Sequence, residues 1–297
     1  MTYDVIVIGA GCTGLGASRR LARGGVSVAN VEAALFGGLI TNVNELEGAF
    51  EGSGADLASS LMMEIADLGC ATLSETVRNV RRDDGAIVVG TDAAEHRARA
   101  AIVASGAALA RLGVPGEAEY AFKGVSQCAD CDGPMFQGED VVVAGGGDSA
   151  FQEALVLSRY CARVRVLHRG AQPAARARWR RALCACDNVE ITPHAEVTAI
   201  EGGDVVERVQ ARIGGRDVTI ECAGIFAYVG LVPASSFLPS TVARDGVGAV
   251  ITDASLESTL PGVYAAGAVR AGYGGTLGDA ADEADRAADA VLRRLRG

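Results

Sequence analysis

The chain contains one local pattern twice: an apolar strand, a glycine-rich turn and then a helix. The first copy runs from segment 3–8 through the turn 9–14 into a helix over about 15–23, and the second from 140–144 through 145–150 into 151–159. Glycine lets the backbone approach a pyrophosphate at the helix N-terminus, and each copy keeps both its strand and its helix. The sequence therefore predicts an α/β protein with two Rossmann-like, three-layer dinucleotide-binding domains.

The residue that ends the second strand of each unit indicates what the unit binds. Glu32 follows strand 27–31, where a carboxylate would bind ribose hydroxyls. His168 and Arg169 follow strand 164–167, and a basic residue there suits a 2′-phosphate better than a bare diol. The arginines over 176–181 either add to that site or form a solvated helix face. The predicted turn contacts are Gly9, Gly11, Cys12, Thr13 and Gly14 in the first unit, and Gly145, Gly147, Asp148, Ser149 and Ala150, with Arg176, in the second.

Turn-rich segments indicate how the two domains connect. A chain of 297 residues with 49% hydrophobic content can bury two ordinary cores but hardly a third. Segments 112–117 and 244–248 read as crossings, and the last fifty residues return to a strand and an alanine-rich helix. We therefore expect a discontinuous first domain, 1–115 and 247–297, with the second domain, 116–246, inserted into it.

Composition excludes several classes of partner. The net charge of −10 argues against binding of nucleic acid through a broad basic surface. No stretch approaches the roughly 20 apolar residues of a membrane span. The chain enters its first strand without a basic leader or cleavage site, so we expect a cytoplasmic protein with no membrane partner.

The segment 128–133, Cys-Ala-Asp-Cys-Asp-Gly, is the strongest chemical signal. Cytoplasmic thiols are mostly kept reduced, so a close cysteine pair there indicates redox or metal chemistry, not a structural framework. A metal would need two more ligands, and His96, His168 and His194 have no ligand-like spacing with the pair. We therefore predict a CxxC disulfide and no metal. A helix that starts near the first cysteine would lower a thiolate pKa.

With these motifs in hand, the chain resembles the low-molecular-weight thioredoxin reductases and the wider class II pyridine nucleotide-disulfide oxidoreductases. The resemblance runs nearly end to end, through 37–38, 104–107, 230–233 and 261–267 besides the turns and the CxxC segment. It implies FAD on the first domain, NADPH or NADH on the second, and a homodimer in which one domain rotates against the other. The FAD contacts that it adds are Gly37, Gly38, Ser105, Gly106, Gly267, Ala268 and Thr276.

The same resemblance implies roles for three residues. Cys131 would be the sulfur that faces the flavin, and Cys128 the interchange thiol that attacks the substrate disulfide. Asp132 would pass a proton to the leaving thiolate. The substrate would be a thioredoxin-like protein or a small disulfide or dithiol.

Three positions depart from the family pattern. The family has His-Arg-Arg and another arginine four residues later, whereas this chain has His168-Arg169-Gly170 and Ala174. Each lost charge-assisted contact removes roughly 1.5 to 3 kcal/mol, so the preference for NADPH over NADH falls unless Arg176 substitutes. Ala268 replaces an aspartate that would hold a ribityl hydroxyl, and Gly275-Thr276 stands where an Arg-Gln pair is expected near the flavin ring.

Two alternatives to a nucleotide-driven reductase therefore stay open. An FAD-dependent dithiol oxidase would pass electrons to oxygen, and the eroded arginine motif is compatible with it. Asp132 argues for the reductase, because the oxidase branch tends to carry another residue after the second cysteine. A reductase fed by ferredoxin or another carrier would also need no NAD(P)H step.

Overall fold

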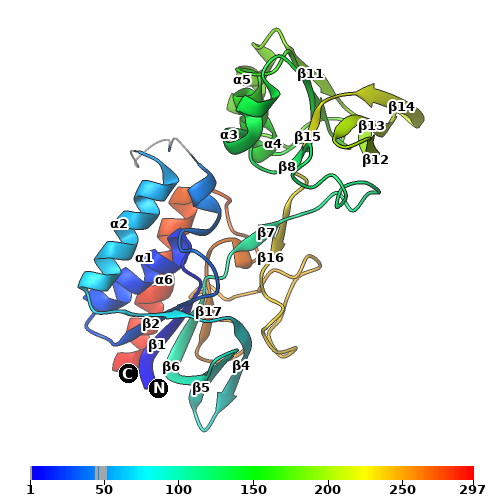
Figure 1. Cartoon of the computed structure of the whole chain (residues 1–297). Helices are drawn as coiled ribbons and strands as arrows, with labels where there is room; N and C mark the ends of the chain where they lie inside the picture. Colours follow the sequence, from blue (N-terminus) through cyan, green and yellow to red (C-terminus); the bar gives the residue numbers. More distant parts are fainter. Residues whose placement is uncertain (1, 44–45, 47–51) are drawn as a thin grey trace. The chain divides into compact units, whose positions relative to one another are not determined.

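The computed structural model describes residues 2–43, 46 and 52–297, and the chain divides into two compact units (Figure 1). Unit 1 comprises Met1–Ala108 and Val232–Gly297, and unit 2 comprises Leu109–Leu231. The two connecting segments, β7 (Ala107–Leu109) and β16 (Leu231–Pro233), pair in a two-stranded sheet. The predicted α/β fold, with one Rossmann-like domain inserted into another, is confirmed.

Unit 1 is built on a seven-stranded sheet in the order β3-β2-β1-β6-β5-β4, with β17 also paired to β6. Pairs among β3, β2, β1, β6 and β17 are parallel, whereas β4, β5 and β6 form an antiparallel meander. The strands are β1 (Thr2–Ile8), β2 (Val28–Glu32), β3 (Ala71–Ser74), β4 (Val77–Asp83), β5 (Ala86–Thr91), β6 (Glu95–Val103) and β17 (Val263–Ala265). Its helices are α1 (Cys12–Arg23), η1 (Gly38–Asn42), α2 (Gly54–Asp67), η3 (Gly267–Val269) and α6 (Leu277–Arg296).

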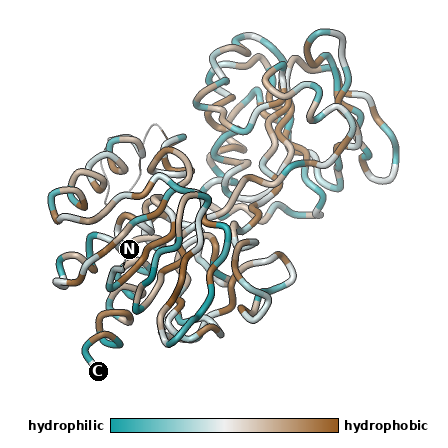
Figure 2. Tube along the Cα trace, turned by 60° about the horizontal axis from the view of Figure 1, so that its bottom comes forward, coloured by the Kyte–Doolittle hydropathy of each residue, from teal (hydrophilic) through white to brown (hydrophobic). Residues whose placement is uncertain are grey.

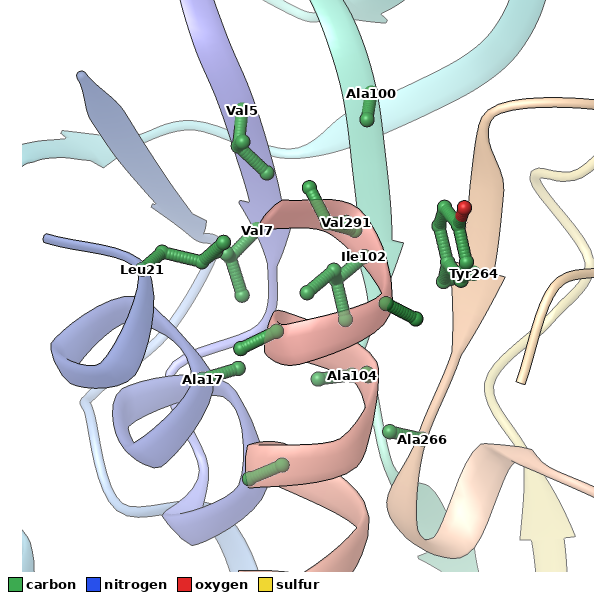
Figure 3. Packing of buried hydrophobic residues seen from close by; sticks show 14 of the residues in the cluster. Val5, Val7, Ala17, Leu21, Ala100, Ile102, Ala104, Tyr264, Ala266 and Val291 are labelled. Atoms are coloured by element: carbon green, nitrogen blue, oxygen red, sulfur yellow. The ribbon is translucent and has the colours of Figure 1, made fainter. Parts of the chain in front are cut away.

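Alternate residues of β1 fill two different cores, because successive side chains of a strand point to opposite faces. Val5 and Val7 pack against α1 and α6. Ile6 and Ile8 pack against the β4–β5 hairpin and the segment that contains Leu238. Figure 3 shows the helix-covered core, in which Val7 lies among Ala17, Leu21, Ile102 and Val291, whereas Tyr264 of β17 lies beyond β6.

Unit 2 has three layers. Its central sheet is parallel, in the order β11-β10-β9-β15-β8, with helices packed in one core and a separate antiparallel sheet, β12-β13-β14, in the other. The parallel strands are β8 (Val125–Ser126), β9 (Asp140–Ala144), β10 (Arg163–Leu167), β11 (Val189–Thr192) and β15 (Gly224–Ala227). The others are β12 (Ala195–Gly202), β13 (Val206–Ile213) and β14 (Arg216–Glu221), and the helices are α3 (Ala129–Asp132), η2 (Gly133–Phe136), α4 (Asp148–Leu157) and α5 (Ala177–Cys184).

Hydropathy follows this layering within each unit. The inner strands are the most hydrophobic stretches of the trace (Figure 2), and their side chains are buried. Among the described residues, no helix is long and apolar enough to span a membrane.

The unit boundaries differ from the predicted ones at residues 115 and 247. Leu112 and Val114 pack on the core of unit 2, so the first crossing comes before them. Leu238 and Val242 are buried in the core of unit 1, so the second crossing comes at Leu231–Val232. Glycine-rich turns marked these segments in the sequence, but the core that each apolar side chain enters decides where a unit ends.

Candidate active site

The first glycine turn brings α1 directly onto the ends of β1 and β6. Gly9 has φ +107°, and a Cβ on it would lie 2.3 Å from the Ala104 carbonyl oxygen. A Cβ on Gly14 would lie 1.9 Å from the Gly9 oxygen. Among the described residues no side chain caps α1 and its first turn holds no acid, so its backbone N–H groups are available to an anion. The turn therefore fits a pyrophosphate.

Glu32 lies beside this turn with acceptor capacity left over. Its two carboxylate oxygens accept the N–H groups of Ala10 at 2.8 Å and Ala34 at 3.0 Å. An ionised carboxylate has about four acceptor positions, so each oxygen retains one for a ribose hydroxyl. The geometry agrees with the ribose role predicted for Glu32.

The other glycines predicted to contact FAD gather around the same turn. Gly37 forms a β-bridge with Gly11, and a Cβ on Gly38 would lie 3.6 Å from the Gly11 Cα. Gly267, at φ +75°, approaches Thr13 so closely that a Cβ would lie 2.5 Å from the threonine hydroxyl. Gly37 lies 26 residues from its bridge partner Gly11 and Gly267 lies 254 residues from Thr13, so distant segments pack against the turn, as a cofactor cradle requires.

The remaining predicted contacts of unit 1 have other structural tasks. Ser105 donates its hydroxyl to the Ala234 carbonyl at 2.7 Å, and Gly106 has φ +67°. Thr276 is the N-cap of α6, where its hydroxyl accepts the Asp279 N–H at 3.1 Å in a capping box. Ala268 lies in η3, and its methyl side chain cannot form a hydrogen bond. Burial raises the pKa of the Cys12 thiol, which fits a residue that fills the turn.

A buried ion pair that sequence reasoning missed lies next to Gly267. The Glu283 side chain is 5% exposed and accepts the Gly267 N–H at 2.8 Å and Arg270 Nε at 3.0 Å. Arg270 Nη2 also contacts the second Glu283 oxygen. No sequence period joins Arg270, which directly follows η3, to Glu283 of α6, so only the fold could reveal this pair.

The second glycine turn lines a cavity of about 610 Å³ in unit 2. A Cβ on Gly145 would lie 2.3 Å from the Tyr228 carbonyl oxygen, so this glycine is needed for close packing. In contrast, a Cβ on Gly147 meets no described atom within 4 Å and would project into open space. The cavity also includes Asp148, Ser149, His168, Arg169 and Gly170. The space beside Gly147 fits the phosphates of a dinucleotide.

The cationic side of this cavity differs from the expectation. His168 is 5% exposed, and burial together with nearby His194 lowers its pKa, so the imidazole is neutral near pH 7. Arg176 donates its Nε–H to the Asp148 carboxylate, so the guanidinium is held at the start of α4. Of the predicted basic residues, the exposed Arg169 is the cation that lines the cavity. Arg111, which was not among the predicted contacts, also lines the cavity, so the cations there are only partly the predicted ones.

Cys128 and Cys131 form a disulfide, with Cα atoms 5.3 Å apart. Cys128 is the N-cap of α3, so the helix begins directly after the first cysteine. The Cys131 N–H donates to the Cys128 sulfur at 3.2 Å. Cys131 is exposed and Cys128 partly exposed, so both sulfurs are open to reaction partners.

Asp132 is tied to this disulfide through Ser126, a residue that sequence reasoning missed. The Ser126 hydroxyl donates to Asp132 Oδ2 at 2.6 Å and accepts the Cys128 N–H at 3.1 Å. Ser126 ends β8, two residues before the cysteine, so the strand fixes the carboxyl relative to the sulfurs. One hydroxyl thus links the partly exposed Asp132 carboxyl to the backbone of Cys128.

A second missed group, Glu153 with Tyr228, contacts the start of α3. The Ala129 N–H donates to Glu153 Oε2 at 2.9 Å and to the Tyr228 hydroxyl oxygen at 3.1 Å. Tyr228 in turn donates to the same Glu153 oxygen at 2.9 Å. Burial raises the pKa of both side chains.

Comparison with known proteins places this geometry among flavoenzymes. The family model described as "Pyridine nucleotide-disulphide oxidoreductase" matches residues 3–289. The chain is 32% identical to thioredoxin reductase of Treponema pallidum over 275 residues, covering 91% of this chain and 89% of that protein. It is 34% identical to the Mycolicibacterium smegmatis thioredoxin reductase over 274 residues, covering 89% and 88%.

Solved structures agree with the sequence comparisons. The thioredoxin reductase of Lactococcus lactis (FR conformation) superimposes with a TM-score of 0.94 at 29% identity, covering 99% of both chains. The T. acidophilum thioredoxin reductase superimposes with a TM-score of 0.93 at 31% identity, covering 100% of this chain and 99% of the other.

Proposed function

The chain belongs to the pyridine nucleotide-disulphide oxidoreductase family and is a flavin-dependent disulfide oxidoreductase, and we propose that it reduces a thioredoxin-like protein through Cys128 and Cys131. The disulfide at the start of α3, with Asp132 held beside it by Ser126, carries this proposal. The curated relatives named thioredoxin reductases supply the class of substrate.

Unit 1 supports FAD as the flavin. The turn Gly9–Gly14, Glu32 and the glycines at 37, 38 and 267 would hold its pyrophosphate and ribose, because they combine free backbone donors with spare carboxylate acceptors. When bound, FAD supplies a ring that exchanges an electron pair with a dithiol.

Unit 2 supports a nicotinamide nucleotide as the reductant. The N–H groups at the start of α4 and the open space beside Gly147 suit its pyrophosphate. Because His168 is neutral and Arg176 is paired with Asp148, we expect NADH and NADPH to be used with similar efficiency.

The family resemblance supplies the roles of the two cysteines and the carboxyl in the thiol steps. In the reduced enzyme the Cys128 thiolate attacks one sulfur of the substrate disulfide, and the other sulfur leaves as a thiolate. Asp132, in its protonated form, gives that thiolate a proton. The Cys131 thiolate then attacks Cys128, restores the Cys128–Cys131 disulfide and releases the second substrate sulfur.

Anaerobic titration of the flavin-loaded protein tests the source of electrons. We expect NADH and NADPH each to bleach the flavin. If neither does so while reduced ferredoxin does, the carrier-fed alternative replaces this proposal. Oxygen consumption with a dithiol alone would identify the oxidase instead.

Cys128→Ser tests the route to the substrate. The variant is expected to lose reduction of thioredoxin while NAD(P)H still bleaches its flavin, because only the interchange thiol is gone. Cys184→Ser, which removes an exposed cysteine of α5, is the control and should behave as wild type. Full activity in Cys128→Ser would contradict the assignment. The predicted homodimer is checked separately by sedimentation.

A further inference from the structure

Two side chains converge on one backbone N–H beside the disulfide. Ala129 is fully buried and is the first residue of α3, directly after Cys128. Its N–H is shared between Glu153 Oε2 and the Tyr228 hydroxyl oxygen, and the Tyr228 O–H closes the triangle on the same carboxylate oxygen. The distances of 2.9, 3.1 and 2.9 Å are all those of ordinary hydrogen bonds.

The two partners come from rigid elements of unit 2. Glu153 is in the middle of α4, the helix that follows the second glycine turn, and Tyr228 directly follows β15. Tyr228 is 8% exposed and belongs to the core with Phe151 and Leu157. A short helix of four residues has little stability of its own, so contacts of this kind fix its first turn.

A buried carboxylate at this place also acts on the sulfurs electrostatically. When Glu153 is ionised, its negative charge lies on the N–H next to Cys128 and opposes a thiolate there, as does the nearby Asp130. Reduction turns the uncharged disulfide into two thiols, and ionisation of one of them to a thiolate stabilises the reduced form, so a nearby negative charge that opposes the thiolate destabilises that form. A carboxylate therefore favours the disulfide over the dithiol.

We propose that Glu153 and Tyr228 are positioning residues for the redox pair: they fix the first turn of α3 and bias the Cys128–Cys131 equilibrium toward the disulfide. The inference rests on the proposed role of these cysteines as the redox pair. It gives the enzyme a more strongly reducing dithiol than the same CxxC helix would have without the carboxylate.

Glu153→Gln tests the bias, because glutamine keeps the size and an acceptor for Ala129 but removes the charge. The flavin-loaded protein is equilibrated with defined ratios of reduced and oxidised dithiothreitol. Each Cys128–Cys131 disulfide that is reduced then forms one molecule of oxidised dithiothreitol. Alkylation then traps the thiols, and the mass of the peptide that contains residues 128 and 131 gives the two populations. We expect the equilibrium constant to shift at least threefold toward the dithiol, which corresponds to about 14 mV.

Glu190→Gln is the matched control. Glu190 is on β11, at the opposite edge of the sheet from β8, and it pairs with Arg165 of β10. The Glu190 side chain is 57% exposed. This variant should stay within twofold of wild type. If Glu153→Gln also stays within twofold, the inference is wrong. If Cys128 and Cys131 of the wild-type protein cannot be reduced and reoxidised at all, the proposed function of this pair is wrong. That outcome differs from an unchanged equilibrium in Glu153→Gln, which would contradict only the role of Glu153.

Tyr228→Phe tests whether these side chains fix the first turn of α3. It also provides a second test if Glu153→Gln does not fold. The ring stays in the core, while the Ala129 N–H loses one acceptor and Glu153 loses one donor. Deuterium uptake of segment 128–133 in the oxidised protein should rise at least twofold relative to wild type. Unchanged uptake would refute the positioning role.

Discussion

Arg176 donates both its backbone N–H and its side-chain Nε to the carboxylate of Asp148, at 2.7 and 3.1 Å. The pair joins the residue before α5 to the first residue of α4, and Asp148 lines the 610 Å³ cavity of unit 2. It offsets the positive charge of an arginine that could otherwise contact a 2′-phosphate. We therefore expect kcat/KM values for NADH and NADPH within about tenfold of each other.

Asp148→Asn tests this relationship directly. The neutral side chain can still accept the Arg176 N–H, but the guanidinium is no longer held by a full charge. The ratio of kcat/KM for NADPH over NADH should rise by about threefold, the size expected from a partly exposed ion pair. Glu190→Gln removes an equal charge away from the cavity and should leave the ratio unchanged. A constant ratio in Asp148→Asn would contradict the idea.

Gly14→Ala should prevent flavin binding. Its Cβ would lie 1.9 Å from the Gly9 carbonyl oxygen, so α1 must move away from the turn that would hold the pyrophosphate. Gly246→Ala is the control in the same unit, because a Cβ there meets no described atom within 4 Å. Absorbance at 450 nm per purified chain measures the bound flavin. A yellow Gly14→Ala protein with normal flavin content would disprove the assignment of this turn.

Glu283→Gln should destabilise unit 1 strongly. The substitution leaves Arg270 buried with a neutral partner, and breaking a buried pair costs about 3 to 5 kcal/mol. Asp289→Asn breaks the exposed pair with Arg20 and should cost far less, because water screens exposed ion pairs. Urea unfolding followed by circular dichroism gives the free energy of unfolding of both variants. Equal losses would show that the Arg270–Glu283 pair stabilises unit 1 no more than the exposed pair does.

The stability of unit 2 should depend on pH through Glu153. Burial raises the pKa of this carboxyl in the folded state, so its favourable contribution is complete below the ordinary glutamate pKa and is lost as the pH rises through the folded value. Glutamine does not titrate. The urea midpoint of Glu153→Gln minus that of wild type should therefore increase from pH 4 to pH 8. The fluorescence of Trp179, the single tryptophan, follows the unfolding.

Asp130→Asn provides the control for this pH dependence. The charge of Asp130 helps to raise the pKa of Glu153, while the pKa of Tyr228 is raised as well, so the phenol stays protonated over this range. Removing the Asp130 charge should make the pH dependence smaller. A difference between wild type and Glu153→Gln that does not change with pH would exclude Glu153 as the titrating group.

The repeated strand, turn and helix were legible in the sequence because their determinants are local. Glycine at positions 9 and 145 is required by positive φ and close backbone contact, and apolar runs mark the buried strands. The CxxC disulfide was equally legible, since three residues of separation suffice to bring its sulfurs together. Both helices, however, begin at the end of their glycine turns, at Cys12 and Asp148, which is earlier than predicted.

Charge states and partners at the site depended on contacts between distant segments. The sequence alone determined two dinucleotide folds and a disulfide-forming pair of cysteines, because strand period, glycine geometry and short spacing are properties of neighbouring residues. Only the tertiary structure decided that His168 is neutral, that Arg176 is held by Asp148 and that Glu153 reaches Ala129. Burial and pairing across some 24 to 28 residues set these properties, and no local pattern encodes them.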